Sequence, residues 1–109
     1  MRNTTQNPKA PGTQASVVHQ VRELINLLKN SRLTEANLSS LSSEFMELSR
    51  LTDTKAHTGV SRTSRQFSDI FKFNVRNIPD DLPLILRTAR RFLDSVLSRR
   101  EFETETENP

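Results

Sequence analysis

The sequence predicts an all-α fold: a helical hairpin over residues 16–51 and a C-terminal amphipathic helix over residues 82–100, in one small bundle with disordered termini. Apolar residues recur at helical spacing in both regions. The chain contains two glycines, fewer than the tight turns of a β-sandwich or barrel require. Its 109 residues, 33% of them hydrophobic, suffice for a single domain with a modest core.

The first helix of the hairpin is predicted over residues 16–30. Val17, Val21, Leu24 and Leu28 repeat every three or four residues and therefore share one face, and Ser16 can cap the N-terminus. Residues 1–14 are polar, contain two prolines and have no periodicity. This composition predicts a disordered arm.

The second helix is predicted over residues 34–51, with Thr34 as its N-cap. Its interior contains several serines, which are weak helix formers. The helix is therefore expected to depend on packing against the first helix. The link at residues 31–33 is short, which favours an antiparallel hairpin.

The apolar residues of the second helix follow the 3-4-3 spacing of a narrow seam. They are Leu38, Leu41, Phe45 and Leu48. A core of this size is marginal for a monomer. We therefore expect a homodimer or a hetero-complex, with this seam as the dimer or partner interface.

The second half of the chain alternates connections and helices. A basic loop is predicted over residues 52–65, centred on Gly59, and a short helix over residues 64–73. The last helix has clear boundary signals, because Asp80 or Asp81 can cap it and Pro83 suits its first position. Its broad apolar face extends to about Arg100, and the Glu- and Thr-rich tail 101–109 is predicted to be disordered.

The net charge of +3 is unevenly distributed, because four of the thirteen acidic residues lie in the tail. In the last helix, Arg87, Arg90 and Arg91 lie together beside the apolar face. Such a row can follow the phosphates of a nucleic acid. The alternative is a solvated helix face whose arginine stems pack on the edge of the core.

The leading functional prediction is a dimer that binds RNA, in double-stranded form, by shape and charge. Arg87, Arg90 and Arg91 form one predicted contact row, and Arg62 and Arg65 from the basic loop form a second. The alternative is a protein–protein adaptor whose charges only keep it soluble. A third possibility is a membrane-surface helix at residues 82–100.

An enzyme is not predicted, and neither a cofactor nor a metal site is expected. His19 and His57 are the two histidines, and each stands apart from any catalytic motif. The chain has no cysteine and too few glycines for a phosphate-binding loop. No signal peptide or membrane span is visible, so a cytoplasmic location is expected, with the nucleus as an alternative.

The amino-acid usage suggests an origin in a virus. Leu, Ser and Arg, which have the most codons, account for 37 of the 109 residues. Such a bias is typical of a protein encoded by a reading frame that overlaps another gene. In size, helical pattern and arginine content the chain is similar to small viral RNA-binding suppressors of RNA silencing, although no motif is shared. A viral accessory protein acting in host–virus interaction is the resulting hypothesis, beside an ordinary arginine-rich helical protein.

Overall fold

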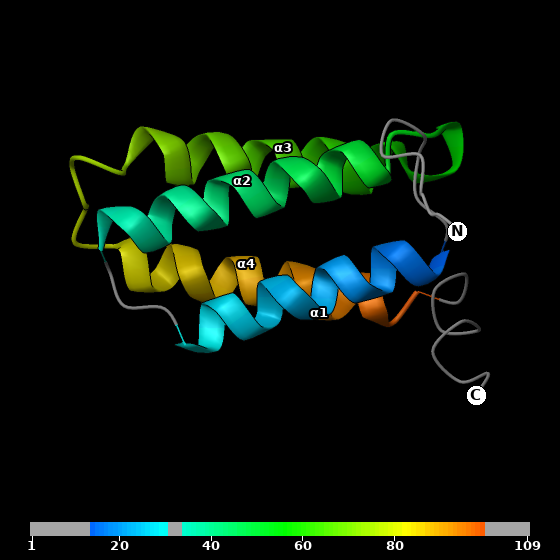
Figure 1. Cartoon of the computed structure of the whole chain (residues 1–109), viewed down its shortest axis with the longest axis horizontal. Coiled ribbons are helices and arrows are strands. Elements are labelled where there is room, and N and C mark those ends of the chain that lie inside the picture. Colours follow the sequence, from blue (N-terminus) through cyan, green and yellow to red (C-terminus); the bar gives the residue numbers. More distant parts are fainter. Residues whose placement is uncertain (1–13, 31–33, 100–109) are drawn as a thin grey trace, which may run out of the picture.

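The protein is a four-helix bundle in which successive helices run in opposite directions (Figure 1). The computed structural model describes residues 14–30 and 34–99. Its helices are α1 (Gln14–Asn30), α2 (Glu35–Leu51), α3 (Thr58–Phe73) and α4 (Leu82–Leu97), with a short 3₁₀ turn at Lys55–His57. The predicted all-α class is confirmed. The predicted arm up to residue 13, the link at 31–33 and the tail lie outside the described residues.

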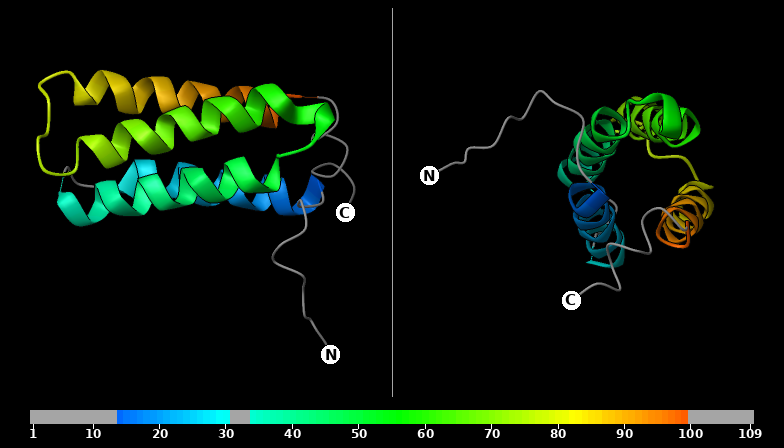
Figure 2. Two further views of the ribbon diagram at one scale, coloured as in Figure 1. Left: turned by 90° about the horizontal axis from the view of Figure 1, so that it is seen from above. Right: turned by 90° about the vertical axis from the view of Figure 1, so that its right-hand side faces the viewer.

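The four helices follow one another around the bundle axis (Figure 2). The backbones of α2 and α3 approach closely, as do those of α1 and α2 and of α1 and α4. Helices α3 and α4 are not among these closely packed pairs, and they meet through Phe67 and Phe92, whose ring centroids lie 5.7 Å apart. The α2–α3 pair and the α1–α4 pair therefore form opposite sides of the bundle.

The predicted seam of the second helix lies in the core of the chain itself. Leu38, Leu41, Phe45 and Leu48 are each at most 1% exposed. The ring of Phe45 lies 5.3 Å from that of Phe67, measured between centroids, so the seam is covered by helices of the same chain. This corrects the prediction that these residues face a partner, because a second chain has to contact other residues.

Serine side chains join α2 to α3 in the interior. The Ser42 hydroxyl donates to the Ser68 carbonyl at 2.8 Å, and the Ser68 hydroxyl donates to the Ser42 carbonyl at 2.7 Å. Further along, the Ser61 hydroxyl donates to the Ser49 carbonyl at 2.8 Å. These small side chains let the two backbones approach while each hydroxyl keeps a partner. The packing partner of α2 is thus α3 as well as the expected α1.

The helix starts agree with the sequence in some places and differ in others. The Thr34 hydroxyl accepts from the Asn37 backbone N–H at 3.2 Å, which confirms the predicted N-cap. Helix α1 begins at Gln14, so Ser16 lies inside it and is not its cap. Helix α3 begins at Thr58, so most of the predicted loop 52–65 is helical and Gly59 lies in a first helical turn.

Helix α4 begins where the sequence predicted. Pro83 lies in its first turn and Asp81 occupies the cap position, although the Asp81 side chain makes no capping hydrogen bond. The helix ends at Leu97, before the predicted end at Arg100, which lies outside the described residues. Leu82, Ala89, Leu93 and Val96 face the core.

Candidate nucleic-acid interface

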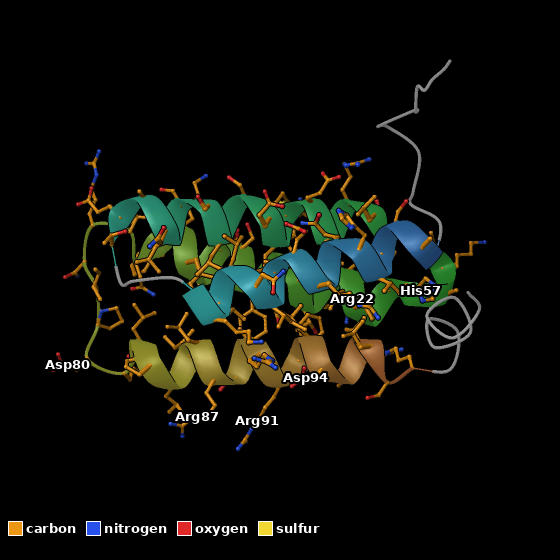
Figure 3. All side chains as sticks on the ribbon, turned by 60° about the horizontal axis from the view of Figure 1, so that its bottom comes forward. Arg22, His57, Asp80, Arg87, Arg91 and Asp94 are labelled. Atoms are coloured by element: carbon orange, nitrogen blue, oxygen red, sulfur yellow. The ribbon has the colours of Figure 1, made fainter. Side chains whose placement is uncertain are left out.

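Two arginines project from the outer side of α4. Arg87 and Arg91 are exposed, and Figure 3 shows both side chains extending away from the bundle. They are separated by four residues, which places them on one face about 6 Å apart along the helix axis. The predicted row is therefore present at these two positions.

Arg90 differs from its two neighbours because it has an acidic partner. Its Nε atom donates to Oδ1 of Asp94 at 3.2 Å, one turn further along α4. Both side chains are partly exposed, and an ion pair of this kind contributes little stability. The pair nevertheless neutralises Arg90, so Arg87 and Arg91 carry most of the positive charge of the row.

The orientation of α4 follows from its contact with α3. Phe92 touches Phe67 and therefore marks the flank of α4 that faces α3. At 100° per residue, Arg87 and Arg90 lie about 140° and 160° away from Phe92, whereas Arg91 lies about 100° away, on the outward side of α4. Since α4 packs closely against α1, the flank of Arg87 and Arg90 is the one beside α1, and Arg91 points away from the bundle next to it.

Helix α1 contributes two cations to the same side of the bundle. The Gln20 amide donates to the Glu44 carbonyl at 2.9 Å and to its carboxylate at 2.7 Å, so Gln20 marks the flank that faces α2. Arg22 and Lys29 lie about 160° and 180° around the helix from Gln20, on the flank beside α4. They are two turns apart, about 10 Å along one face, and both are exposed.

We call the four residues Arg22, Lys29, Arg87 and Arg91 the α1–α4 basic face. Arg22 and Lys29 were not among the predicted contact residues. The available signal was their position at the edge of the apolar stripe of the first helix, but periodicity alone does not reveal which helix lies next to that edge.

The α1–α4 basic face has little acidic compensation. Helices α1 and α4 contain one acidic residue each, Glu23 and Asp94. Glu23 lies about 100° around α1 from Arg22, away from α4, and Asp94 is paired with Arg90. Within residues 14–30 and 34–99, none of the four cations of the face forms an ion pair.

The second predicted row lies elsewhere. Arg62 and Arg65 are exposed on α3, and Arg65 lines a hollow of about 270 Å³ between α3 and α2. That side of the bundle is opposite the α1–α4 pair. The structure therefore does not bring Arg62 and Arg65 together with Arg87, Arg90 and Arg91 in one surface, because the segment assigned to a loop is a helix packed on α2.

The α2–α3 side of the bundle carries a groove with less positive charge than the α1–α4 basic face. It contains a groove of about 440 Å³ lined by Ser39, Ser42, Ser43, Met46, Ser68, Lys72 and Val75. In the adjoining hollow, hydrogen bonds to the Glu47 carboxylate raise the pKa of Arg50. The groove thus offers hydroxyls and one cation, a mixture with less positive charge than the α1–α4 basic face.

The remaining chemistry of the described residues is limited. His19 is exposed on α1, and His57 is half-buried in the 3₁₀ turn. No group of His, Cys, Asp and Glu side chains in the described part of the chain is arranged to hold a metal ion. Likewise, none of the described helices is both long and apolar enough to span a bilayer.

Comparison with known proteins gives no assignment: no family model, no curated protein and no solved structure matches this chain.

Proposed function

We propose that this protein binds double-stranded RNA through the phosphate backbone and that the α1–α4 basic face is the contact surface. The supporting observation is the set of four exposed cations without ion pairs on two neighbouring helices. Three of them are arginines, whose planar guanidinium can donate two hydrogen bonds to one phosphate. Binding would release condensed counterions from the nucleic acid, which is the main source of affinity in contacts of this kind.

The distribution of aromatic rings favours backbone contacts over base stacking. Phe45, Phe67 and Phe71 are buried, and Phe92 is turned toward α3. The exposed Phe73 lies at the end of α3. Among the described residues, the α1–α4 basic face thus lacks the aromatic platform on which proteins stack unpaired bases. An A-form duplex, which proteins recognise mainly by its shape, phosphates and 2′-hydroxyls, is the better match.

Recognition of this kind does not depend on base sequence, because phosphates carry no direct sequence information. The protein would cover a duplex and leave it chemically unchanged. Covering duplexes is also a means of suppressing RNA silencing, the role that size and charge suggested.

The test is equilibrium binding of the full chain to two short RNA duplexes of unrelated sequence over a series of salt concentrations. If all four cations contact phosphates, the logarithm of the association constant should fall with the logarithm of salt concentration with a slope of about −3 to −4. The two duplexes should bind with similar affinity. An absence of binding at low salt would overturn the proposal and favour a protein partner.

A further inference from the structure

Exposed apolar side chains gather at the end of the bundle where α3 leads into α4. Five large apolar side chains of the described residues are exposed, and four of them lie between residues 70 and 84. These four are Ile70, Phe73, Ile78 and Leu84, which we call the hairpin patch. Phe73 is 82% exposed and Leu84 is 57% exposed. Single exposed apolar residues are ordinary, but a group of them marks a contact surface.

The packing of α3 explains why this surface is open. Phe67 fills the space toward α4, and Ile70 and Phe73 follow it at intervals of three residues. Each step turns about 60° further around α3, away from Ser68 on the α2 side and toward solvent. The backbones of α3 and α4 approach each other less closely than those of the other neighbouring helices, which leaves Ile70 and Phe73 exposed.

Charges of both signs surround the hairpin patch. Lys72 lies in the last turn of α3, beside the groove with α2, and Arg76 lies in the connection to α4. Asp80 and Asp81 end this connection, and all four side chains are exposed. None of the four forms an ion pair within the described residues. Asp69, which is also exposed, lies one turn before Phe73 on the same face of α3, so two cations and three anions border the patch. In contrast, the four cations of the α1–α4 basic face form no ion pair within the described residues.

We propose that a second copy of this chain covers the hairpin patch, giving a two-fold symmetric dimer. In such a dimer the same surface meets itself, so it must be complementary to itself. An apolar centre with both positive and negative groups at the rim meets this requirement, since the cations of one copy can face the aspartates of the other. A nucleic acid would meet three repelling charges and two attracting ones at this surface.

The dimer would also bring the two α1–α4 basic faces to the two sides of one interface. Arg91 follows Leu84 by seven residues, so the two lie on the same face of α4, two turns apart. The basic residues of the two copies would then flank the dimer interface and form one longer surface for a duplex. This consequence depends on the proposed RNA binding, whereas the dimer itself does not.

Sedimentation of the full chain without RNA tests the dimer independently of RNA binding. We expect a monomer–dimer equilibrium in the micromolar range. The double variant Phe73→Glu/Leu84→Glu should raise the dissociation constant of the dimer by at least about tenfold, because it places charges in the apolar centre. The matched control is His19→Glu/Asn26→Glu, which adds the same two charges at exposed positions of α1 outside the patch and should dimerise like the wild type. Circular dichroism verifies that each variant is folded.

A charge-reversal pair gives a second test that preserves the apolar patch. Lys72→Glu/Arg76→Glu and Asp80→Lys/Asp81→Lys should each dimerise more weakly than the wild type, while an equimolar mixture of the two should form a heterodimer. A wild-type chain that remains monomeric at every concentration would overturn the proposal. A dimer that neither the patch variant nor the charge variants weaken would also overturn it, since a different surface would then be in use.

Discussion

Replacing Arg87 and Arg91 together by alanine is expected to weaken binding of duplex RNA by roughly 10- to 100-fold at about 0.1 M salt. Both guanidinium groups are exposed on one side of α4 and have no acidic partner in the described chain (Figure 3). Each lost phosphate contact removes about one released counterion. The salt slope should therefore become shallower by about 2, and the loss should be similar for duplexes of different sequence.

The matched control for this variant is Arg62→Ala/Arg65→Ala. It removes the same two charges from exposed helical positions, but on α3 and away from α1 and α4. Its salt slope should stay close to that of the wild type. If both double variants weaken binding equally, only the net charge matters, and the α1–α4 basic face is not the contact surface.

Replacing Phe45 by alanine is expected to lower the free energy of unfolding by about 3–5 kcal/mol. The Phe45 side chain is fully buried, with its ring centroid 5.3 Å from that of Phe67 and 5.7 Å from that of Phe71. Its removal leaves a cavity beside two aromatic rings of α3. A domain of this kind has a total stability of about 5–15 kcal/mol, so the variant should unfold at a much lower urea concentration than the wild type.

Phe73→Ala removes the same atoms from an exposed site and is the control for Phe45→Ala. Because Phe73 is 82% exposed, the stability of the monomer should change by less than about 0.5 kcal/mol. The two unfolding curves should be measured at low protein concentration, where self-association does not contribute to stability. Equal losses in the two variants would contradict the assignment of Phe45 to the core.

The existence of three helices could be predicted from the sequence because each has an uninterrupted apolar stripe. The seam of α2 and the broad face of α4 are both present, and Thr34 and Pro83 marked helix starts correctly. The fourth helix, α3, was predicted only in its second half. Its inner face includes Ser64 and Ser68, whose small polar side chains do not register in an apolar pattern.

Those serines are compatible with a buried position because their hydroxyls bind backbone carbonyls. Ser64 donates to the carbonyl of Val60 at 2.7 Å, and Ser68 donates to that of Ser42. The Ser64 contact lies within α3, whereas the Ser68 contact joins α3 to α2 and depends on the tertiary fold. The same reason explains the error on the dimer seam: a 3-4-3 stripe indicates a buried face but does not reveal whether the covering helix comes from the same chain.

The candidate site could be predicted only in part. The arginines of α4 adjoin its apolar face, so their common flank followed from helix geometry. The sequence could not assign Arg22 and Lys29 to the same surface, because this requires knowing that α1 packs beside α4. The pairing of Arg90 with Asp94 is consistent with their four-residue spacing, and it could have been anticipated from that spacing alone.

The most direct test of the α1–α4 basic face is an NMR titration of the full chain with a short RNA duplex, following backbone amides and arginine Nε–H groups. The largest changes should occur around Arg22, Lys29, Arg87 and Arg91, with small changes at Arg62 and Arg65. Changes centred on α2 and α3, or no changes at low salt, would contradict the proposal that this protein binds duplex RNA through α1 and α4.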